Sequence, residues 1–153
     1  MEFKKIDIGR QTNFIFALLL THFVFFGYLS NIYLKSIGTR VLFLYQVLFS
    51  PVSFPSAMIL ALIVYVMVLR EHFYEYGIRN SIWLVLFIMI ESWIWYWFII
   101  ARFDITVIGV YFLRIETYIT ILSLLGINLL SAFLAAFTKE MYRAHMKKTA
   151  ESY

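Results

Sequence analysis

The chain has no cysteine among its 153 residues, so disulfide bonds, thiolate metal sites and cysteine nucleophiles are all excluded. Enzyme motifs are missing as well: there is no glycine-rich phosphate loop, no HExxH zinc motif and no G-x-S-x-G nucleophile elbow. The histidines His22, His72 and His145 fall on separate segments, which argues against a shared metal site. We therefore expect a protein that is not an enzyme and uses no metal or cofactor.

Charged residues are also scarce, at 14% of the chain, against roughly a quarter in soluble domains. Hydrophobic residues reach 63% and aromatic residues 20%. A soluble fold of this size could not hide so much apolar surface, because a small domain leaves a large share of its chain exposed. A lipid bilayer would accommodate that surface instead.

Four apolar runs can be compared with the thickness of a bilayer, which a helix crosses in about 20 residues. They cover residues 14–34, 54–73, 81–101 and 107–137. The tails and connections between them are too short for a folded aqueous domain. The sequence therefore predicts an all-α protein with one transmembrane domain over residues 1–153: an integral membrane four-helix bundle with short loops.

A fifth apolar stretch, residues 41–50, is too short to cross a bilayer by itself. Pro51 and Pro55 follow it, and proline breaks a helix by removing a donor and clashing with the preceding turn. We interpret 41–50 as a short interfacial helix, because one kinked span over 41–69 would be too long for the bilayer. Ser53 is placed to cap the next helix.

The distribution of Lys and Arg predicts the orientation of the chain. With four spans, the basic tails 1–13 and 138–153 share one side with the loop that contains Arg70 and Arg79, and this side carries most of the Lys and Arg residues. The positive-inside rule then places both termini in the cytoplasm. We expect a multipass protein of a bacterial inner membrane. The basic residues flank membrane spans, so lipid headgroups rather than nucleic acid are their expected partners.

Glu91 is the most informative single residue, because it lies near the middle of the run 81–101. An ionised carboxylate at that depth costs a few kcal/mol or more, so it must be neutral, paired or next to water. Helix rise places His22 at nearly the same depth. Arg114, Glu116 and Asn128 complete a predicted intramembrane polar cluster. The cluster would relay protons, coordinate an ion or dock another subunit, or else it would only hold the bundle in register.

Small residues spaced four apart mark two candidate helix-packing faces. Such pairs let helix backbones approach closely in a membrane. They are Ala57 and Ala61 in the second run, and Ser131, Ala132, Ala135 and Ala136 in the fourth. The faces would serve internal packing or a partner helix equally well. By contrast, Trp93, Trp95 and Trp97 alternate along the third run, and we interpret them as an outer aromatic belt.

These features predict a small inner-membrane protein that acts without catalysis, by binding another membrane protein within the bilayer. Almost all of its surface would be lipid-facing helix, so recognition would depend on helix packing and buried polar contacts. An accessory subunit and an immunity or entry-exclusion factor both fit, as does self-association. The alternative hypothesis is a proton- or ion-conducting element that uses Glu91.

Overall fold

The computed structural model describes residues 8–33, 38–51 and 53–150, and within these ranges the chain is helical with no strand. The parts 1–7 and 151–153 of the predicted tails, and Leu34 of the first predicted span, lie outside the described residues. The elements are α1 (Ile8–Leu20), the π-helix η1 (Thr21–Phe26), α2 (Gly27–Tyr33), the 3-10 helix η2 (Gly38–Leu42), α3 (Tyr45–Leu48), α4 (Phe54–Arg70), α5 (Tyr74–Ile100), α6 (Thr106–Phe112) and α7 (Ile115–Ala150).

Three helices are long and apolar enough to cross a membrane: Gln11–Ser30, Tyr74–Ile100 and Ile115–Lys147. A fourth apolar helix, Pro55–Arg70, is shorter. The 17 residues of α4 correspond to about 25 Å of helix, somewhat less than the roughly 30 Å of a hydrocarbon core. The chain is therefore an all-helical protein with three helices of membrane-spanning length and composition.

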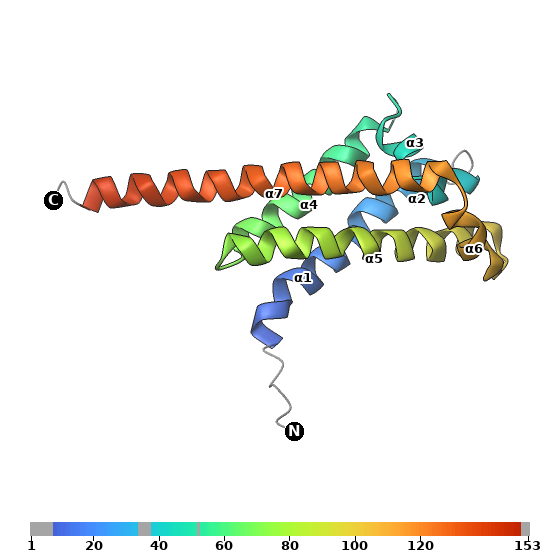
Figure 1. Cartoon of the computed structure of the whole chain (residues 1–153), viewed down its shortest axis with the longest axis horizontal. Coiled ribbons are helices and arrows are strands. Elements are labelled where there is room, and N and C mark those ends of the chain that lie inside the picture. The colour runs from blue at the N-terminus through green and yellow to red at the C-terminus, as the bar shows by residue number, and fades with distance from the viewer. Residues whose placement is uncertain (1–7, 34–37, 52, 151–153) are drawn as a thin grey trace, which may run out of the picture.

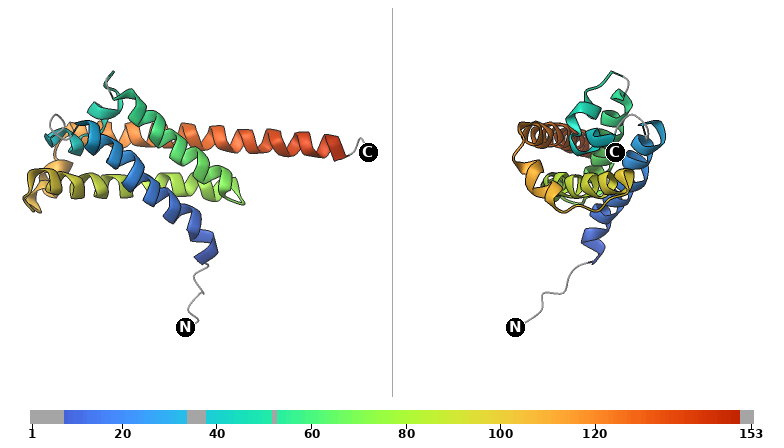
Figure 2. Two further views of the ribbon diagram at one scale, coloured as in Figure 1. Left: turned by 180° about the vertical axis from the view of Figure 1, so that it is seen from behind. Right: turned by 90° about the vertical axis from the view of Figure 1, so that its right-hand side faces the viewer.

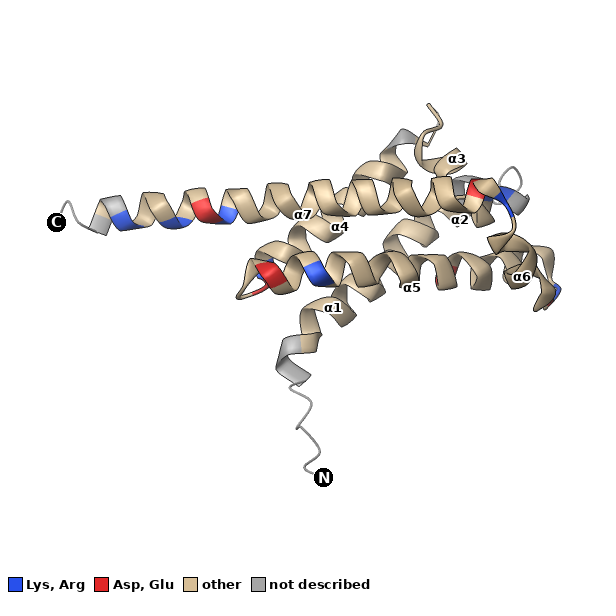
Figure 3. Cartoon of the chain, viewed as in Figure 1, with Lys and Arg blue, Asp and Glu red and all other residues tan. Residues whose placement is uncertain are grey.

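The long helices alternate in direction along the chain (Figures 1 and 2). α5 and α7 run lengthwise, α4 packs most extensively on α7, and it also contacts α1 and α5. The C-terminal part of α7 extends well beyond the other helices (Figure 1). Charged residues gather toward the ends of the long helices and along this extension, and long uncharged stretches lie between them (Figure 3).

The small residues of α4 and α7 lie where these two helices meet. Ala132 and Ala135 are fully buried, and Ser131 is 5% exposed. The Ser131 hydroxyl donates a hydrogen bond to the Ala61 carbonyl oxygen, which ties the two backbones together. Ala57 packs against the same core from α4. Small side chains allow this close approach, so the predicted packing faces serve contacts inside the chain.

The stretch 41–50 forms the end of η2 and the short helix α3, packed against the rest of the chain. Val41, Leu44 and Leu48 are buried in the hydrophobic core, and α3 contacts both α4 and α7. The segment thus covers one end of the long helices with its apolar side chains. Ser53 occupies the N-cap position of α4, but its hydroxyl donates to the Val47 carbonyl oxygen and makes no side-chain cap bond.

Two of the predicted spans differ in an informative way from the helices of the structure. α5 begins at Tyr74, not near residue 81, so Gly77 lies inside the helix. It packs closely against α4, because a Cβ atom at Gly77 would lie 2.9 Å from Val68 Cγ1. Gly77 therefore permits close packing and does not mark a loop. The range 107–137 is divided by a turn at Leu113 and Arg114, which separates α6 from α7.

The division of 107–137 has local causes. The Tyr111 carbonyl oxygen at the end of α6 accepts hydrogen bonds from the Arg114 backbone N–H, at 3.2 Å, and from the Thr117 hydroxyl. These bonds close a turn and leave α7 free to begin at Ile115. One straight helix over 107–137 would measure about 46 Å, considerably more than a bilayer core.

Candidate functional site: the His22–Glu91 pair

His22 and Glu91 lie side by side on neighbouring helices, η1 and α5. The distance from His22 Nδ1 to Glu91 Oε2 is 3.8 Å, within ion-pair range but longer than a hydrogen bond. The side chain of His22 is 43% exposed, and that of Glu91 is 16% exposed. Glu91 Oε2 is buried and has no hydrogen-bond partner among the described residues. The pair is therefore only partly satisfied.

The pair lies deep within the candidate spans. Glu91 is four residues from Phe87, the midpoint of Tyr74–Ile100, which corresponds to about 6 Å along the helix axis. His22 lies within two residues of the middle of Gln11–Ser30. If these helices cross a bilayer, the exposed part of the pair at this depth faces lipid or another protein, and lipid offers it no hydrogen bond.

The backbone that carries His22 is a π-helix over Thr21–Phe26 between α1 and α2. A π-turn inserts an extra residue into a helix, and such turns frequently occur at functional sites. The Thr21 hydroxyl donates to the Ala17 carbonyl oxygen at 2.9 Å, which satisfies one group within the widened turn. Phe25 and Phe26 bury their rings in the core, and His22 stays half-buried.

Aromatic rings surround the imidazole. The His22 ring centroid lies 5.7 Å from that of Trp95 and 5.0 Å from that of Phe23. Trp95 also stacks on Phe26, with centroids 6.1 Å apart and an interplanar angle of 10°. Phe23 is 70% exposed and packs edge-on against His22. The rings fix the position of the imidazole and supply no partner for the Glu91 carboxylate.

The other predicted members of the polar cluster lie elsewhere. The Arg114 guanidinium lies over the Phe43 ring, 5.9 Å from its centroid. Glu116 is in the first turn of α7, where a carboxylate is favoured by the helix dipole. Asn128 is fully buried and donates from Nδ2 to the Ser81 carbonyl oxygen at 3.0 Å.

Of the five residues predicted as one cluster, the structure therefore brings His22 and Glu91 together and places the rest in separate environments. Ser81, the partner of Asn128, is ten residues from Glu91 on α5, or about 15 Å away. His22–Glu91 is the one acidic–basic contact within ion-pair distance in the part of the chain that the structure describes, so Arg114 forms none with either glutamate.

The three tryptophans, predicted as an aromatic belt, pack against other elements of the chain. All three are partly buried and contact other elements of the chain. Trp93 packs edge-on against Tyr111, Trp95 packs on Phe26, and the Trp97 indole N–H donates to the Asp104 carbonyl oxygen at 3.0 Å. Their alternate spacing distributes them around α5, so each one meets a different neighbour.

Sequence analysis missed a second polar cluster, which lies at the turn between α4 and α5. Its members are Asn13, Glu71, Asn80, Lys139 and Arg143, and we call it the α4-turn cluster. The spacing of Lys139 and Arg143, four residues apart near the end of an apolar helix, was the available signal. In the sequence alone, this spacing is equally typical of a basic tail that flanks a membrane.

No protein-family model matches the chain, and no curated protein or solved structure is significantly similar to it. The role of the pair must therefore be argued from its geometry. Among the described residues no three His, Asp or Glu side chains gather in one place, and a structural zinc site requires four ligands. An imidazole and a carboxylate in this arrangement can instead accept or donate hydrogen bonds to a neighbouring helix, or exchange a proton.

Proposed function

We propose that the chain is a multipass protein of a bacterial inner membrane that acts without catalysis, by binding another integral membrane protein inside the bilayer. The partner would contact the surface formed by His22, Phe23 and Glu91. An accessory subunit of a larger complex and an immunity or entry-exclusion factor are the two kinds of protein that fit this mode of action.

The proposal rests on the exposure of the His22 imidazole next to Glu91. A polar group that loses water without gaining a hydrogen bond costs several kcal/mol in hydrocarbon. His22 is nevertheless 43% exposed near the middle of its span, and Glu91 Oε2 lacks a hydrogen-bond partner among the described residues. A partner helix with a polar side chain at this depth would form a hydrogen bond with the exposed imidazole and cover it. Binding would thus remove an unfavourable exposure of the isolated chain.

The proposed topology has four crossings with both termini in the cytoplasm. The alternating directions of α1, α4, α5 and α7 support it (Figures 1 and 2). α4 would cross as the shortest span, and a bilayer accommodates such a helix by local thinning. The basic residues of the α7 extension and the loop after α4 then lie on the same side, as the positive-inside rule requires.

Photo-crosslinking from within the bilayer tests the proposal. A photoreactive phenylalanine analogue replaces Phe23, which contacts His22 and is 70% exposed. The control replaces Phe133, which is 57% exposed near the middle of the Ile115–Lys147 span. We expect one crosslinked protein of defined mass from position 23 and none from position 133.

Equal labelling from both positions would contradict a specific contact at the pair. A product with twice the mass of this chain would show that the partner is a second copy of it. That result would contradict the proposal that the chain binds a different protein. Products that contain lipid alone at position 23 would contradict the proposal altogether.

A second candidate function is proton or ion conduction, which the 3.8 Å approach of two titratable side chains favours. The parent chain and the variant Glu91→Gln are reconstituted in liposomes, and proton flux is measured with a trapped pH indicator. Conduction through the pair predicts flux in the parent and its loss in the variant. This hypothesis fails if the parent conducts no better than empty liposomes or if the variant conducts equally well.

A further inference from the structure

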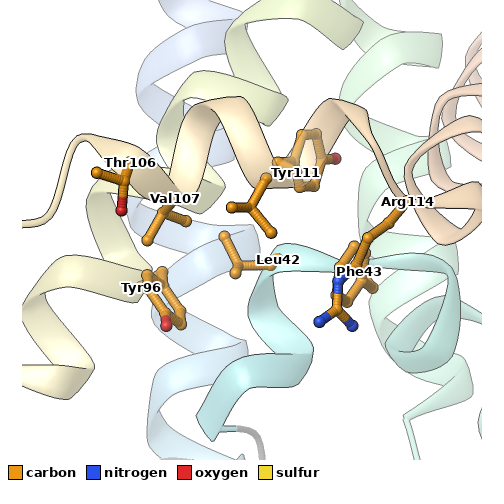
Figure 4. A pocket seen from close by; sticks show the side chains of 8 residues that line it. Leu42, Phe43, Tyr96, Thr106, Val107, Tyr111 and Arg114 are labelled. Carbon is orange, nitrogen blue, oxygen red and sulfur yellow. The ribbon is translucent and has the colours of Figure 1, made fainter.

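A separate pocket of about 310 Å³ lies at the end of the long helices opposite to the α4–α5 turn. Its walls come from η2, the C-terminal half of α5, α6 and the turn before α7 (Figure 4). This volume is at the lower end of the range for small-molecule sites. The pocket is distinct from the His22–Glu91 pair, because neither residue lines it.

The lining of the pocket is apolar with polar groups at its edges. Leu42, Val107 and Val110 form the apolar wall. Arg114 lies at one end of the pocket beside Phe43, and Tyr96 lies at the other end (Figure 4). The guanidinium is 5.9 Å from the Phe43 ring centroid, and Arg114 forms no ion pair with the described residues. Its charge is thus held beside an apolar surface with its donors available.

The charge of Asp104 determines where an anion would be favoured. The hydroxyl and the backbone N–H of Thr106 donate to Asp104 Oδ1 at 2.6 Å and 3.0 Å. These hydrogen bonds hold the pKa of the Asp104 carboxyl below its usual value, so it stays ionised at neutral pH. Thr106 lines the pocket at the start of α6, whereas Arg114 follows the end of α6. An anionic group would therefore favour the Arg114 end.

The position of the pocket indicates an amphiphile. It lies beside the loop that contains Arg102 and Asp104, between α5 and α6, where the apolar spans end. An arginine at this depth is well suited to a phosphate, because its planar guanidinium can donate two parallel hydrogen bonds. The adjacent valine and leucine side chains provide a surface for a hydrocarbon chain.

We propose that this pocket binds an anionic glycerophospholipid, with the phosphate on Arg114 and part of one acyl chain against Leu42, Val107 and Val110. Tyr96 limits the length of chain that the pocket can hold. The site would recognise the phosphate and the apolar chain together, and a soluble phosphate ester would make only the first of these contacts.

Native mass spectrometry of the delipidated full chain in detergent tests this proposal. The probes are phosphatidylglycerol and phosphatidylcholine with the same palmitoyl and oleoyl chains, and glycerol phosphate as the soluble ester. The variants are Arg114→Gln and a matched control, Arg102→Gln, which removes an exposed arginine outside the pocket. A charged hydrogen bond contributes enough for roughly a tenfold effect on affinity.

We expect the parent to retain phosphatidylglycerol in preference to phosphatidylcholine, Arg114→Gln to lower that retention roughly tenfold, and Arg102→Gln to retain it like the parent. Val110→Trp, which fills the pocket and keeps the arginine, should also lower retention. Equal effects of the two arginine variants, or equal retention of the two lipids, would overturn the proposal. So would displacement of phosphatidylglycerol by an equal concentration of glycerol phosphate, which would assign the site to a soluble ester.

Discussion

The two polar clusters of this protein differ in how completely their groups are satisfied. In the α4-turn cluster, Lys139 Nζ donates to the Glu71 carbonyl oxygen, and Arg143 donates to the His72 carbonyl oxygen at 3.3 Å. Asn80 Nδ2 donates to the Glu71 side chain at 3.2 Å. The His22–Glu91 pair has a single 3.8 Å approach. The satisfied cluster holds helices together within the chain, whereas the pair leaves the buried Glu91 Oε2 without a hydrogen bond and the imidazole of His22 half-exposed.

The α4-turn cluster supplies hydrogen-bond donors to the carbonyl groups at the end of α4. The last carbonyl groups of a helix lack partners within the helix, and positive charges near them are favourable because of the helix dipole. Asn13 from α1 donates to the Arg70 carbonyl oxygen at 3.3 Å, and the basic residues of α7 contact the carbonyls that follow. These bonds join α1 and α7 to the end of α4, so the cluster stabilises the fold.

Lys139→Ala should have the largest effect on stability. It removes the charged donor to the Glu71 carbonyl oxygen and leaves the end of α4 without that cap. A hydrogen bond to a charged group contributes about 1.5–3 kcal/mol, and we expect a loss of that size in the free energy of unfolding. The measurement is unfolding in mixed micelles with increasing sodium dodecyl sulfate.

Lys147→Ala is the matched control, because Lys147 is exposed on the same helix. Its effect should stay within about 0.5 kcal/mol. Equal losses in the two variants would show that the α4-turn cluster is no more important to the fold than the exposed α7 extension.

Gly77→Ala should have the next largest effect, because the added Cβ would lie 2.9 Å from Val68 Cγ1 and 3.2 Å from Val68 Cα. Overpacking of this kind costs about 1–2 kcal/mol. Gly126→Ala is the control: its added Cβ has no neighbour within 4 Å, and it should be neutral or mildly stabilising. The same unfolding assay applies. Comparable stability of both alanine variants would contradict the close α4–α5 approach.

Apart from the control variants, the double variant His22→Leu and Glu91→Leu should have the smallest effect on stability. A partly satisfied ion pair contributes little net stability, and its replacement by apolar residues is often neutral or favourable. We expect a change below about 1 kcal/mol in the direction of greater stability. A loss as large as that of Lys139→Ala would mean that the pair, like the α4-turn cluster, holds the fold together.

The sequence predicts those features that depend on distance along a helix. The runs of apolar residues identify the long helices, and helix rise places His22 and Glu91 at similar depths. The direction that a side chain takes around its helix depends on tertiary packing, so Arg114, Glu116 and Asn128 could not be separated from the pair in advance. Small deviations from helical geometry determine which residues face each other.

The helix boundaries also depend on tertiary contacts that the sequence does not reveal. Glycine is typical of turns, but tertiary packing places Gly77 inside α5. No proline or glycine marks the turn at Leu113 and Arg114, which is closed by hydrogen bonds to the Tyr111 carbonyl oxygen. Lys139 could be recognised as basic, but its carbonyl partners become apparent only when α4 and α7 are placed together.

The central claim is that the His22–Glu91 pair serves a partner and not the fold. The most direct measurement is the yield of the photo-crosslink from position 23, in the parent chain and in the double leucine variant, at equal amounts of folded protein. We predict that the variant stays folded and loses the crosslinked partner protein. Full crosslinking in the stable variant would contradict the claim.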